Sequence, residues 1–599
     1  MPRQLRAAVA LAALLLSACG ASSSTTDAGD TSQPSSDPSR TVTQALSFET
    51  SDGATLHATI RGTDDLRPRP LLIEFSPYGA GSDIPDFGPA YNHIFVNARG
   101  TGQSSGVWTA VGPHDQQDVS EFVAWACQQP WSNGHIGLYG FSASAIAVYN
   151  SLHLPLACVD AAALMAGTND LYRDLLYPGG GMNLLPGAVV GLGVGAPIIL
   201  GGLLNLVQQP GLPLAQVFAG VGFLGTITNV LAHTTEDQFW LDRTQRAGPN
   251  HFPVLADTSF YDVESRGPFE SYKMLRDLGV PVHLKTLGAH DGFPANTDGP
   301  QPAYRRWFDH YLLGKDNGVE SEAKVELLIG HGGYGALKAG DFTRIETSDW
   351  PVPGTRWQTF YLDPARGGGA HSLNDGQLDP QPPAQQARQG YPALTSLLAS
   401  DPNTTATVSA AGVGTLFQFL PFLDEMGLVE TLSLTYTTPA LNADVDVVGP
   451  ASLVLHLSSV LPEADIVAVI ADVWPDGSAH AVGIGRLRSS FPDLVAERSV
   501  VDDRGEIVQP YADHSQKSFA LPAQMREYHV EFWPVGNRFQ AGHRLRLYLT
   551  GAATYSIPAP NLNLVSIGGD TPSRLLLPVL PGSDLCAATG TSCDSAALR

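Results

Sequence analysis

The sequence predicts an α/β domain followed by an all-β domain, and three observations carry that prediction. From about residue 45 to 345, short buried apolar runs alternate with helical stretches, as a mainly parallel sheet requires. From about 346 to 585, short runs rich in β-branched residues are separated by turns, which is typical of a β-sandwich or jelly roll. With 599 residues, the chain is also long enough for two large domains.

The elements of the α/β domain can be placed along the chain. Apolar runs that end in turn residues indicate strands, and an amphipathic pattern or a terminal Gly314 indicates helices. The expected strands are 71–79, 94–100, 157–167 and 281–290, and the expected helices are 118–129 and 303–314. The strands expected in the all-β domain are 357–362, 430–438, 451–459, 465–477, 529–535 and 543–552.

Charge and composition exclude some classes of function. The chain has 34 basic and 58 acidic residues, which gives a net charge of −24. A nucleic-acid partner is therefore not expected, because such proteins need a basic surface. None of the cysteines shows the spacing of metal ligands, so no metal site and no cofactor are predicted.

The N-terminus reads as an export signal. Residues 1–18 combine a short basic start with an apolar stretch that is too short to span a bilayer. The run Leu-Ser-Ala-Cys that ends at Cys19 resembles a bacterial lipobox, which predicts lipidation of Cys19 and attachment to a membrane. A plain signal peptide with a chance cysteine is the alternative. Residues 19–44, rich in Ser, Thr and Pro, are expected to form a flexible tether.

Four further cysteines would lie in an exported, disulfide-permissive setting. Cys586 and Cys593 lie close together in a C-terminal tail, 586–599, and could close a small loop. Cys127 and Cys158 lie in apolar stretches, where two buried thiols and a bridge are equally compatible with the sequence.

A long uncharged segment interrupts the α/β pattern. No Lys, Arg, Asp or Glu occurs between Asp174 and Glu236. Hydropathy alone would indicate that this segment is a transmembrane helix. Because glycines and prolines punctuate the run and α/β sequence continues on both sides, we expect an apolar helical cap over the active site, at about 171–250.

The stretch GLYGFSASAIAVY, from Gly137 to Tyr149, reads as a strand, a tight turn and a helix of small residues. This is the outline of a nucleophile elbow, in which a strained turn exposes a serine hydroxyl, here that of Ser142. The usual motif is G-x-S-x-G, whereas this chain has Ser144 two residues after the serine. The alternative is an ordinary serine at the start of a helix.

Acyl transfer by serine needs a base and an acid that orients the base. In an α/β hydrolase these follow the serine in the order acid, then histidine. Asp262 follows an apolar run and precedes a helix, and His290 lies in a glycine-flanked loop after the next strand. Asp257 and His283 are rivals, but both fall inside predicted strands. Taken singly, Asp262 could cap a helix and His290 could lie on a surface loop.

The chain resembles the cocaine esterase / Xaa-Pro dipeptidyl-peptidase-like serine hydrolases, a family that includes α-amino-acid ester hydrolases. The blocks SPYG, NARGTGQSSG, DVSEFVAWACQQPWSNGHIGLYGFS, FYD, GAH and RWFDHYLLGKDNGV occur in the family's order. Three further blocks, DVDVVGPASLVLHLSS, DVWPDGSAHAVGIGRLRSS and NRFQAGHRLRLYLTGA, match its C-terminal jelly roll. The resemblance implies an α/β-hydrolase fold with a helical cap and a C-terminal jelly-roll domain.

The resemblance also implies roles for further residues. The family's elbow is usually G-x-S-Y-x-G, so Ser144 is no defect, and the departures are Ala143 for Tyr and Ala145 for Gly. The oxyanion donors would be the Tyr78 hydroxyl and the Ala143 backbone N–H, and the absent tyrosine ring predicts space behind the nucleophile. The family's D-x-R-G block has Asn97 in place of its acid, and its arginine, Arg99, is expected to be structural.

Together these patterns predict an exported lipoprotein hydrolase that needs no cofactor and cleaves a small-molecule ester or a short peptide through Ser142, Asp262 and His290. Carboxylic esters are favoured, because the uncharged cap offers no acid for a substrate's α-ammonium group. An Xaa-Pro dipeptidyl peptidase or an α-amino-acid ester hydrolase is the alternative. A catalytically silent surface-binding lipoprotein is the second alternative.

Overall fold

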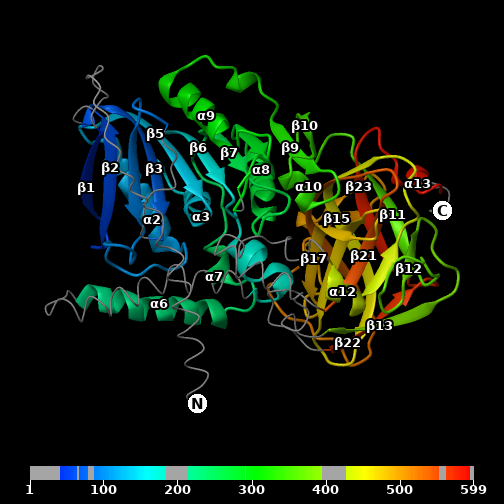
Figure 1. The fold of residues 1–599 in the computed structure, drawn as a ribbon. Coiled ribbons are helices and arrows are strands. Elements are labelled where there is room, and N and C mark those ends of the chain that lie inside the picture. Colours follow the sequence, from blue (N-terminus) through cyan, green and yellow to red (C-terminus); the bar gives the residue numbers. More distant parts are fainter. Residues whose placement is uncertain are drawn as a thin grey trace, which may run out of the picture.

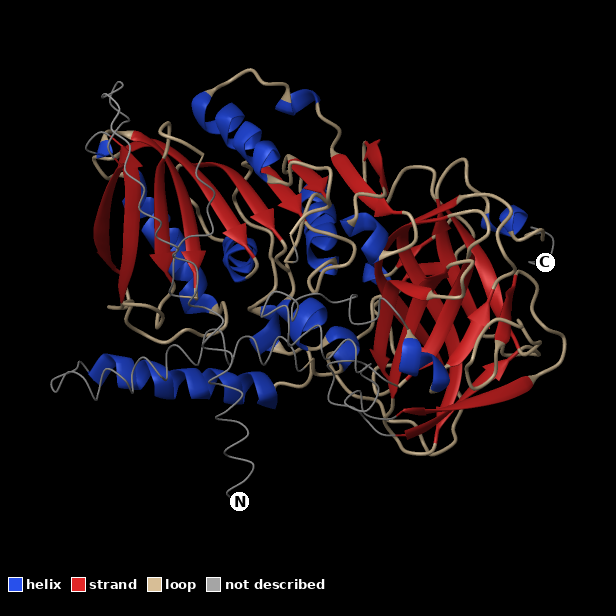
Figure 2. Cartoon of the chain, viewed as in Figure 1, coloured by secondary structure: helices blue, strands red, loops and turns tan. Residues whose placement is uncertain are grey.

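The computed structural model shows an α/β part and a β-rich part that lie side by side (Figures 1 and 2). The predicted signal sequence, Cys19 and most of the predicted tether lie outside the described residues. The structure describes residues 41–63, 66–78, 87–183, 214–290, 292–393, 426–551, 561–591 and 593.

The α/β part is built on one twisted sheet. Its central strands, from β4 to β9, pair in parallel, and antiparallel strands flank them on both sides. In spatial order the strands are β1 (Thr41–Glu49), β2 (Thr55–Thr63), β4 (Asn92–Asn97), β3 (Arg69–Ser76), β5 (Ser132–Phe141), β6 (Val159–Met165), β7 (Val254–Asp257), β8 (Val282–Lys285), β9 (Val325–Gly330) and β10 (Phe342–Thr347). The alternation expected from the sequence is therefore confirmed for this half of the chain.

Helices cover both faces of this sheet. Because side chains alternate along a strand, Ile73 and Leu72 of β3 enter different apolar clusters on opposite faces. The cluster with Ile73 is completed by α2 (Pro113–Cys127), α3 (Ala143–Ser151) and α8 (Arg266–Asp277). The cluster with Leu72 is completed by α9 (Gln301–Leu313), which Gly314 caps with a φ of 65° as the sequence predicts.

The C-terminal part is β-rich, with strands that pair almost entirely antiparallel within the described residues. Its longest pairing joins β15 to β20. Each of the six strands expected here corresponds to a strand of the structure, and described helices are limited to α12 (Gly427–Thr431), α13 (Leu585–Ala588) and the single turn Ala496–Arg498. The strands are β11 (Arg356–Asp363), β12 (Gly376–Asp379), β13 (Ala387–Ala393), β14 (Leu434–Thr437), β15 (Val445–Ser459), β16 (Asp465–Val473), β17 (Ala479–Arg488), β18 (Val500–Val501), β19 (Ile507–Gln509), β20 (Arg526–Phe539), β21 (Arg544–Thr550), β22 (Asn561–Ile567) and β23 (Arg574–Val579).

Two expected boundaries differ from the structure. The tether was expected to reach residue 44, but β1 begins at Thr41, where β-branched side chains pair with β2. The tail was expected from residue 586, but Cys586 lies in α13, is buried, and forms a disulfide with Cys593. Both ends of the fold therefore extend a few residues further than composition indicates.

The expected cap is only partly described, because residues 184–213, which hold most of the glycine-rich apolar run, lie outside the described residues. The described elements of 171–250 are all helical: the π-helix η2 (Leu171–Leu176), the 3₁₀ turn η3 (Pro178–Gly180), α6 (Leu214–Ala232) and α7 (Gln238–Leu241). Helix α6 packs Phe223 on Trp108, with ring centroids 6.3 Å apart. Across the described ranges, no helix is both long and apolar enough to cross a membrane.

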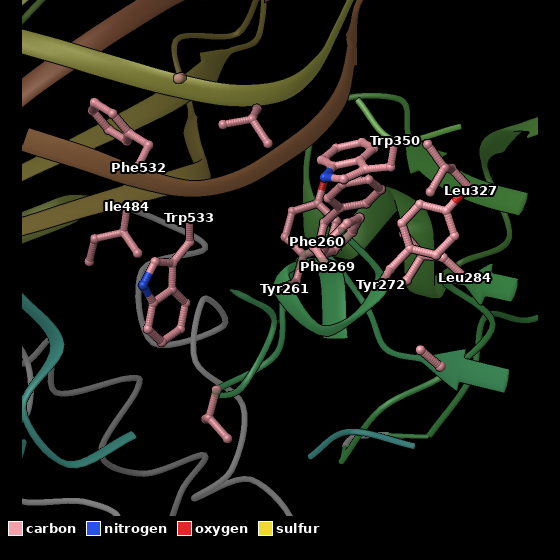
Figure 3. Close-up of a cluster of buried hydrophobic side chains, with 14 of the residues drawn as sticks. Phe260, Tyr261, Phe269, Tyr272, Leu284, Leu327, Trp350, Ile484, Phe532 and Trp533 are labelled. Carbon is pink, nitrogen blue, oxygen red and sulfur yellow. The ribbon is translucent and has the colours of Figure 1, made fainter. Parts of the chain in front are cut away.

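The segment between β7 and α8 contacts the β-rich part. Phe260 packs so tightly on β20 that a Cβ at Gly536 would lie 2.3 Å from its ring, and the Tyr261 hydroxyl donates to the Gly536 carbonyl at 3.2 Å. Figure 3 shows Phe260 and Tyr261 grouped with Trp350 below the strand that carries Phe532. The two parts are thus joined directly at the loop that carries Asp262.

Candidate active site

Ser142 occupies a strained turn between β5 and α3. Its φ of 55° and ψ of −122° lie outside the regions that residues with a side chain normally adopt. The turn is held because the Ser142 N–H donates to the Met165 carbonyl and the Ile146 N–H donates to the Ser142 carbonyl, both at 3.0 Å. An ordinary helix-start serine would not need this conformation, so the geometry is that of an elbow.

Glycines leave the room that this turn needs. A Cβ at Gly140 would lie 2.5 Å from the Ala145 backbone, and a Cβ at Gly167 would lie 2.5 Å from the Ala145 Cβ. The extra methyl of Ala145 is therefore accommodated by the glycine that faces it. Ser144 is fully buried and donates a hydrogen bond of 3.0 Å to Glu74 of β3, so it anchors the helix to the sheet.

Asp262 and His290 are brought together as the chain order predicts. Nδ1 of His290 lies 2.9 and 3.1 Å from the two carboxylate oxygens of Asp262, and both side chains are almost fully buried. Asp262 lies in the turn after β7, and His290 lies in the loop after β8. The His290 ring is 5.0 Å from that of Phe141, the residue before Ser142, so the pair lies beside the elbow.

The two rival residues have structural partners instead. The Asp257 carboxylate accepts hydrogen bonds from the Tyr304 hydroxyl at 2.6 Å and from the Leu287 N–H at 2.8 Å, and burial raises its pKa to about 7. His283 accepts a hydrogen bond from the Lys324 ammonium at 2.9 Å, and burial, with the neighbouring lysines, lowers its pKa to about 4. Asp257 therefore ties helix α9 to the sheet, and His283 stays neutral on the sheet face.

The expected oxyanion donors lie at the elbow. The Tyr78 hydroxyl is 3.4 Å from Ser142 Oγ, and Ala143 is the first residue of α3. A cavity of about 20 Å³ lies against Ala143 and is also lined by Pro77 and Trp108. The structure therefore has a small space beside Ala143.

Arg99 fixes the loop after β4 by binding two carboxylates. Its Nε lies 2.7 Å from Asp118 Oδ2, and its Nη1 lies 2.9 Å from Asp52 Oδ2. Asn97, which stands in place of the family's acid, donates to the His57 carbonyl at 3.3 Å. These contacts support the structural role expected for Arg99.

Buried acids that sequence reasoning missed lie next to the Asp262 loop. Glu264 is two residues past Asp262 and only 3% exposed, and burial raises its pKa to about 8. Asp174 is fully buried and bonds to Thr168 and to Arg266, and burial raises its pKa to about 7. The one sequence signal for Glu264 was its position two residues after Asp262. The burial of Glu264 could not be predicted, because it depends on contacts with residues distant in sequence.

Comparison with known families finds a match in two separate regions of the chain. Residues 52–201 match the X-Pro dipeptidyl-peptidase family S15, and residues 317–566 match the X-Pro dipeptidyl-peptidase C-terminal non-catalytic domain. The cocaine esterase of Rhodococcus sp. (strain MB1 Bresler) is 24% identical over an alignment 602 positions long, which covers 88% of this chain and 97% of that protein.

Solved structures share the fold over nearly the whole chain. A CocE/NonD family hydrolase from Staphylococcus aureus aligns with a TM-score of 0.69 and 18% identity, over 90% of this chain and 94% of the other. An α-amino acid ester hydrolase aligns with a TM-score of 0.67 and 16% identity, over 92% and 98% of the two chains. At these identities the likeness concerns the fold alone.

The elbow and the two family matches define this protein as a serine hydrolase. It belongs to the family of the cocaine esterases and X-Pro dipeptidyl-peptidase-like hydrolases, with an S15-type catalytic region and a β-rich C-terminal domain.

Proposed function

We propose that this protein is an exported lipoprotein that hydrolyses small neutral carboxylic esters through Ser142, Asp262 and His290. The observation that carries the proposal is the hydrogen bond of His290 Nδ1 to Asp262 beside the strained turn of Ser142. We interpret the fold as an α/β hydrolase with a helical cap and a C-terminal jelly roll.

In this mechanism Ser142 Oγ attacks the acyl carbonyl carbon while His290 Nε2 takes the hydroxyl proton. Asp262 accepts the Nδ1–H bond and stabilises the imidazolium that forms. The Tyr78 hydroxyl and the Ala143 N–H donate to the oxyanion of the tetrahedral intermediate. His290 then protonates the leaving alcohol, and a water molecule, activated in the same way, releases the acid from the acyl-enzyme.

Apolar surroundings favour an ester with an apolar acyl group. Trp108, Phe223 and Val230 form a buried cluster, and Tyr78 packs against it. A substrate that reaches Ser142 past Tyr78 therefore meets this cluster, and burying its carbon atoms there stabilises the complex.

Export and lipidation at Cys19 remain part of the proposal. The two disulfides Cys127–Cys158 and Cys586–Cys593 support it, because such bonds persist in oxidising compartments.

The mechanism is tested by labelling the purified protein with a fluorophosphonate and assaying p-nitrophenyl esters beside Gly-Pro-p-nitroanilide. We expect labelling and ester turnover in the wild type and neither in Ser142→Ala, with unchanged circular dichroism. Full activity of Ser142→Ala would contradict the mechanism. Faster cleavage of the dipeptide substrate than of the esters would favour an X-Pro dipeptidyl peptidase.

A further inference from the structure

Asp257 is a buried carboxyl group that the proposed triad does not use. It is the last residue of β7, it is fully buried, and it precedes Asp262 in the chain by five residues. A carboxyl group is costly to bury, so one that is enclosed at the edge of the sheet where the triad lies calls for an explanation.

The two carboxylate oxygens of Asp257 join a loop to a helix. Oδ1 accepts a hydrogen bond of 2.8 Å from the Leu287 backbone N–H, and Oδ2 accepts one of 2.6 Å from the Tyr304 hydroxyl. Leu287 opens the loop after β8, which carries His290, and Tyr304 lies on α9. The carboxylate therefore holds the start of the His290 loop against the body of the α/β part.

His290 itself lies in a tight turn just past this hydrogen bond. The Ala289 N–H donates to the Gly292 carbonyl at 3.0 Å, and the Gly292 N–H donates back to the Ala289 carbonyl at 2.9 Å. Only three residues separate Leu287 from His290, so a displacement at Leu287 is carried into the turn. The position of the imidazole thus depends on the hydrogen bond to Asp257.

The backbone of Asp257 reaches the other side of the reacting centre. Its carbonyl accepts a hydrogen bond of 2.9 Å from the Ala166 N–H, in the loop after β6. The next residue of that loop is Gly167, where a Cβ would lie 3.0 Å from the Ser142 carbonyl oxygen. Asp257 is therefore connected to the loops beside both Ser142 and His290.

Three titratable groups, from three elements packed around Asp257, act on its carboxyl group. The Tyr304 hydroxyl of α9 and the Lys285 ammonium of β8 both favour the ionised form. From α3, the Tyr149 hydroxyl is close enough that burial and the charge of Asp257 raise the pKa of Tyr149. Lys285 is the only one of the three that carries a charge at neutral pH.

Lys285 offsets little of the charge of Asp257, because its ammonium is already held by two other carboxylates. It lies 2.8 Å from Glu322 Oε2 and 2.7 Å from Glu326 Oε2. Burial therefore dominates and raises the pKa of Asp257 to about 7, although the hydrogen bond from Tyr304 opposes the rise. The proton of Asp257 is exchanged within the range of pH in which a serine hydrolase works.

Gain of this proton changes the bond to Leu287. An ionised carboxylate accepts from both donors at once, and such charge-assisted bonds are roughly twice as strong as neutral ones. In the protonated group one oxygen becomes a donor. The Tyr304 hydroxyl can turn and accept that proton, but the Leu287 N–H can only donate, and it is left with a neutral acceptor.

We propose that Asp257 is a positioning residue of the active site, whose ionised carboxylate holds the His290 loop in its catalytic arrangement and whose protonation relaxes that loop. The inference rests on the proposed hydrolase function and adds a regulation of the same site by pH, beyond the titration of His290 itself. Asp257 acts through Leu287 and takes no part in the bond-breaking steps.

The first test compares Asp257→Asn with the wild type at a series of pH values. Asparagine has the shape of the protonated acid and leaves Leu287 with a neutral acceptor at every pH. The measurement is kcat/KM for p-nitrophenyl butyrate between pH 5.5 and 9, followed at the isosbestic wavelength of p-nitrophenol. Because both enzymes contain His290, the ratio of wild type to variant cancels the titration of that residue.

We expect this ratio to be roughly fivefold above pH 8, the cost of exchanging a charge-assisted hydrogen bond for a neutral one. It should approach one below pH 6, where the wild type is protonated too, with a midpoint near pH 7. A ratio that does not change with pH would mean that Asp257 has a merely structural role. A ratio within twofold of one at every pH would mean that it does not position His290.

Tyr304→Phe tests the proposal independently, also where Asp257→Asn does not fold. It removes a donor to the ionised form but keeps the Leu287 bond, so the pKa of Asp257 should rise further. The ratio of wild type to Tyr304→Phe should therefore be largest just above pH 7 and close to one at both ends of the range. A ratio that is flat across the range would overturn the proposal.

Tyr91→Phe is the matched control. The Tyr91 hydroxyl donates to Asp309 at 2.7 Å, and Tyr91 belongs to the same apolar cluster as Tyr304, but its partner lies on α9 and not on β7. Its ratio to the wild type should be close to one at every pH, and a ratio with the same pH dependence as that of Tyr304→Phe would overturn the assignment to Asp257. Failure of the proposed function itself would look different, because the wild type would then neither turn over butyrate nor be labelled at Ser142.

Discussion

The hydroxyl of Tyr78 and the Oγ of Ser142 lie 3.4 Å apart, although 64 residues separate them in the chain. In the proposed mechanism, this hydroxyl would donate a hydrogen bond to the oxyanion that forms on a substrate carbonyl. Tyr78 also packs against the apolar cluster of Trp108, so its ring is held while its hydroxyl faces the serine.

Replacing Tyr78 with Phe should lower kcat for an ester by roughly 10²–10³, because one oxyanion donor is lost. Steady-state kinetics on p-nitrophenyl butyrate measure the effect. Tyr177→Phe is the control, since its hydroxyl bonds to the Val230 carbonyl in the same cluster, and it should cost less than tenfold. A loss below tenfold in Tyr78→Phe would place the second donor elsewhere.

For p-nitrophenyl esters, kcat/KM should rise from acetate towards medium-length acyl chains. Each buried methylene stabilises the transition state by about 0.8 kcal/mol, which corresponds to roughly a fourfold gain until the pocket is filled. The series is measured at fixed pH with the wild type. Rates that fall steadily from acetate would contradict an apolar acyl pocket.

Cys19→Ser should release the protein from the membrane fraction. A mature bacterial lipoprotein carries several acyl chains, whereas a single chain binds only marginally. Fractionation of cells followed by immunoblotting shows where the variant is found. If it still sediments with membranes, the uncharged segment at about 175–235 would be the anchor instead of the lipid.

Acidification should destabilise the protein partly through His283. Its pKa falls from an ordinary 6.5 to about 4 in the fold, because burial and Lys324 oppose its charged form. Its contribution to stability is therefore full above pH 6.5 and is lost as the pH falls towards 4. Thermal unfolding between pH 7 and 4 should show a smaller loss for His283→Leu than for the wild type. Equal losses would mean that His283 does not titrate in this range.

Local pattern and chain order were sufficient to predict the candidate triad. The strand, turn and helix around Ser142 follow from apolar runs and glycines, and the positions of Asp262 and His290 follow from the strands that precede them. The geometry found for Asp262 and His290 matches that expectation, while their catalytic roles stay a prediction. Parallel strands end at one edge of a sheet, so residues that follow different strands are expected to meet there.

Contacts between distant residues could not be predicted in the same way. The sequence does not decide whether Cys127 pairs with Cys158, because apolar flanks suit a free thiol as well as the disulfide that the structure has. The bond of Ser144 to Glu74 and the burial of Glu264 depend on how helices and loops pack, which no local pattern encodes. Because the cap segment is uncharged, the sequence indicates an active site without acidic side chains other than the triad acid. Glu264 nevertheless lies next to the candidate site, and it belongs to another segment of the chain.

The β-rich domain packs against the loop that carries Asp262, the proposed catalytic acid. Arg266 lies 3.0 Å from Glu531 of β20, and Phe260 and Tyr261 pack on Gly536 of the same strand. Asp262 lies between these residues in the chain and is buried. Exchanging the β-rich domain between relatives would therefore remove the surface that supports this loop. We expect chimeric proteins to be active only when β20 and the loop that packs on it come from the same parent.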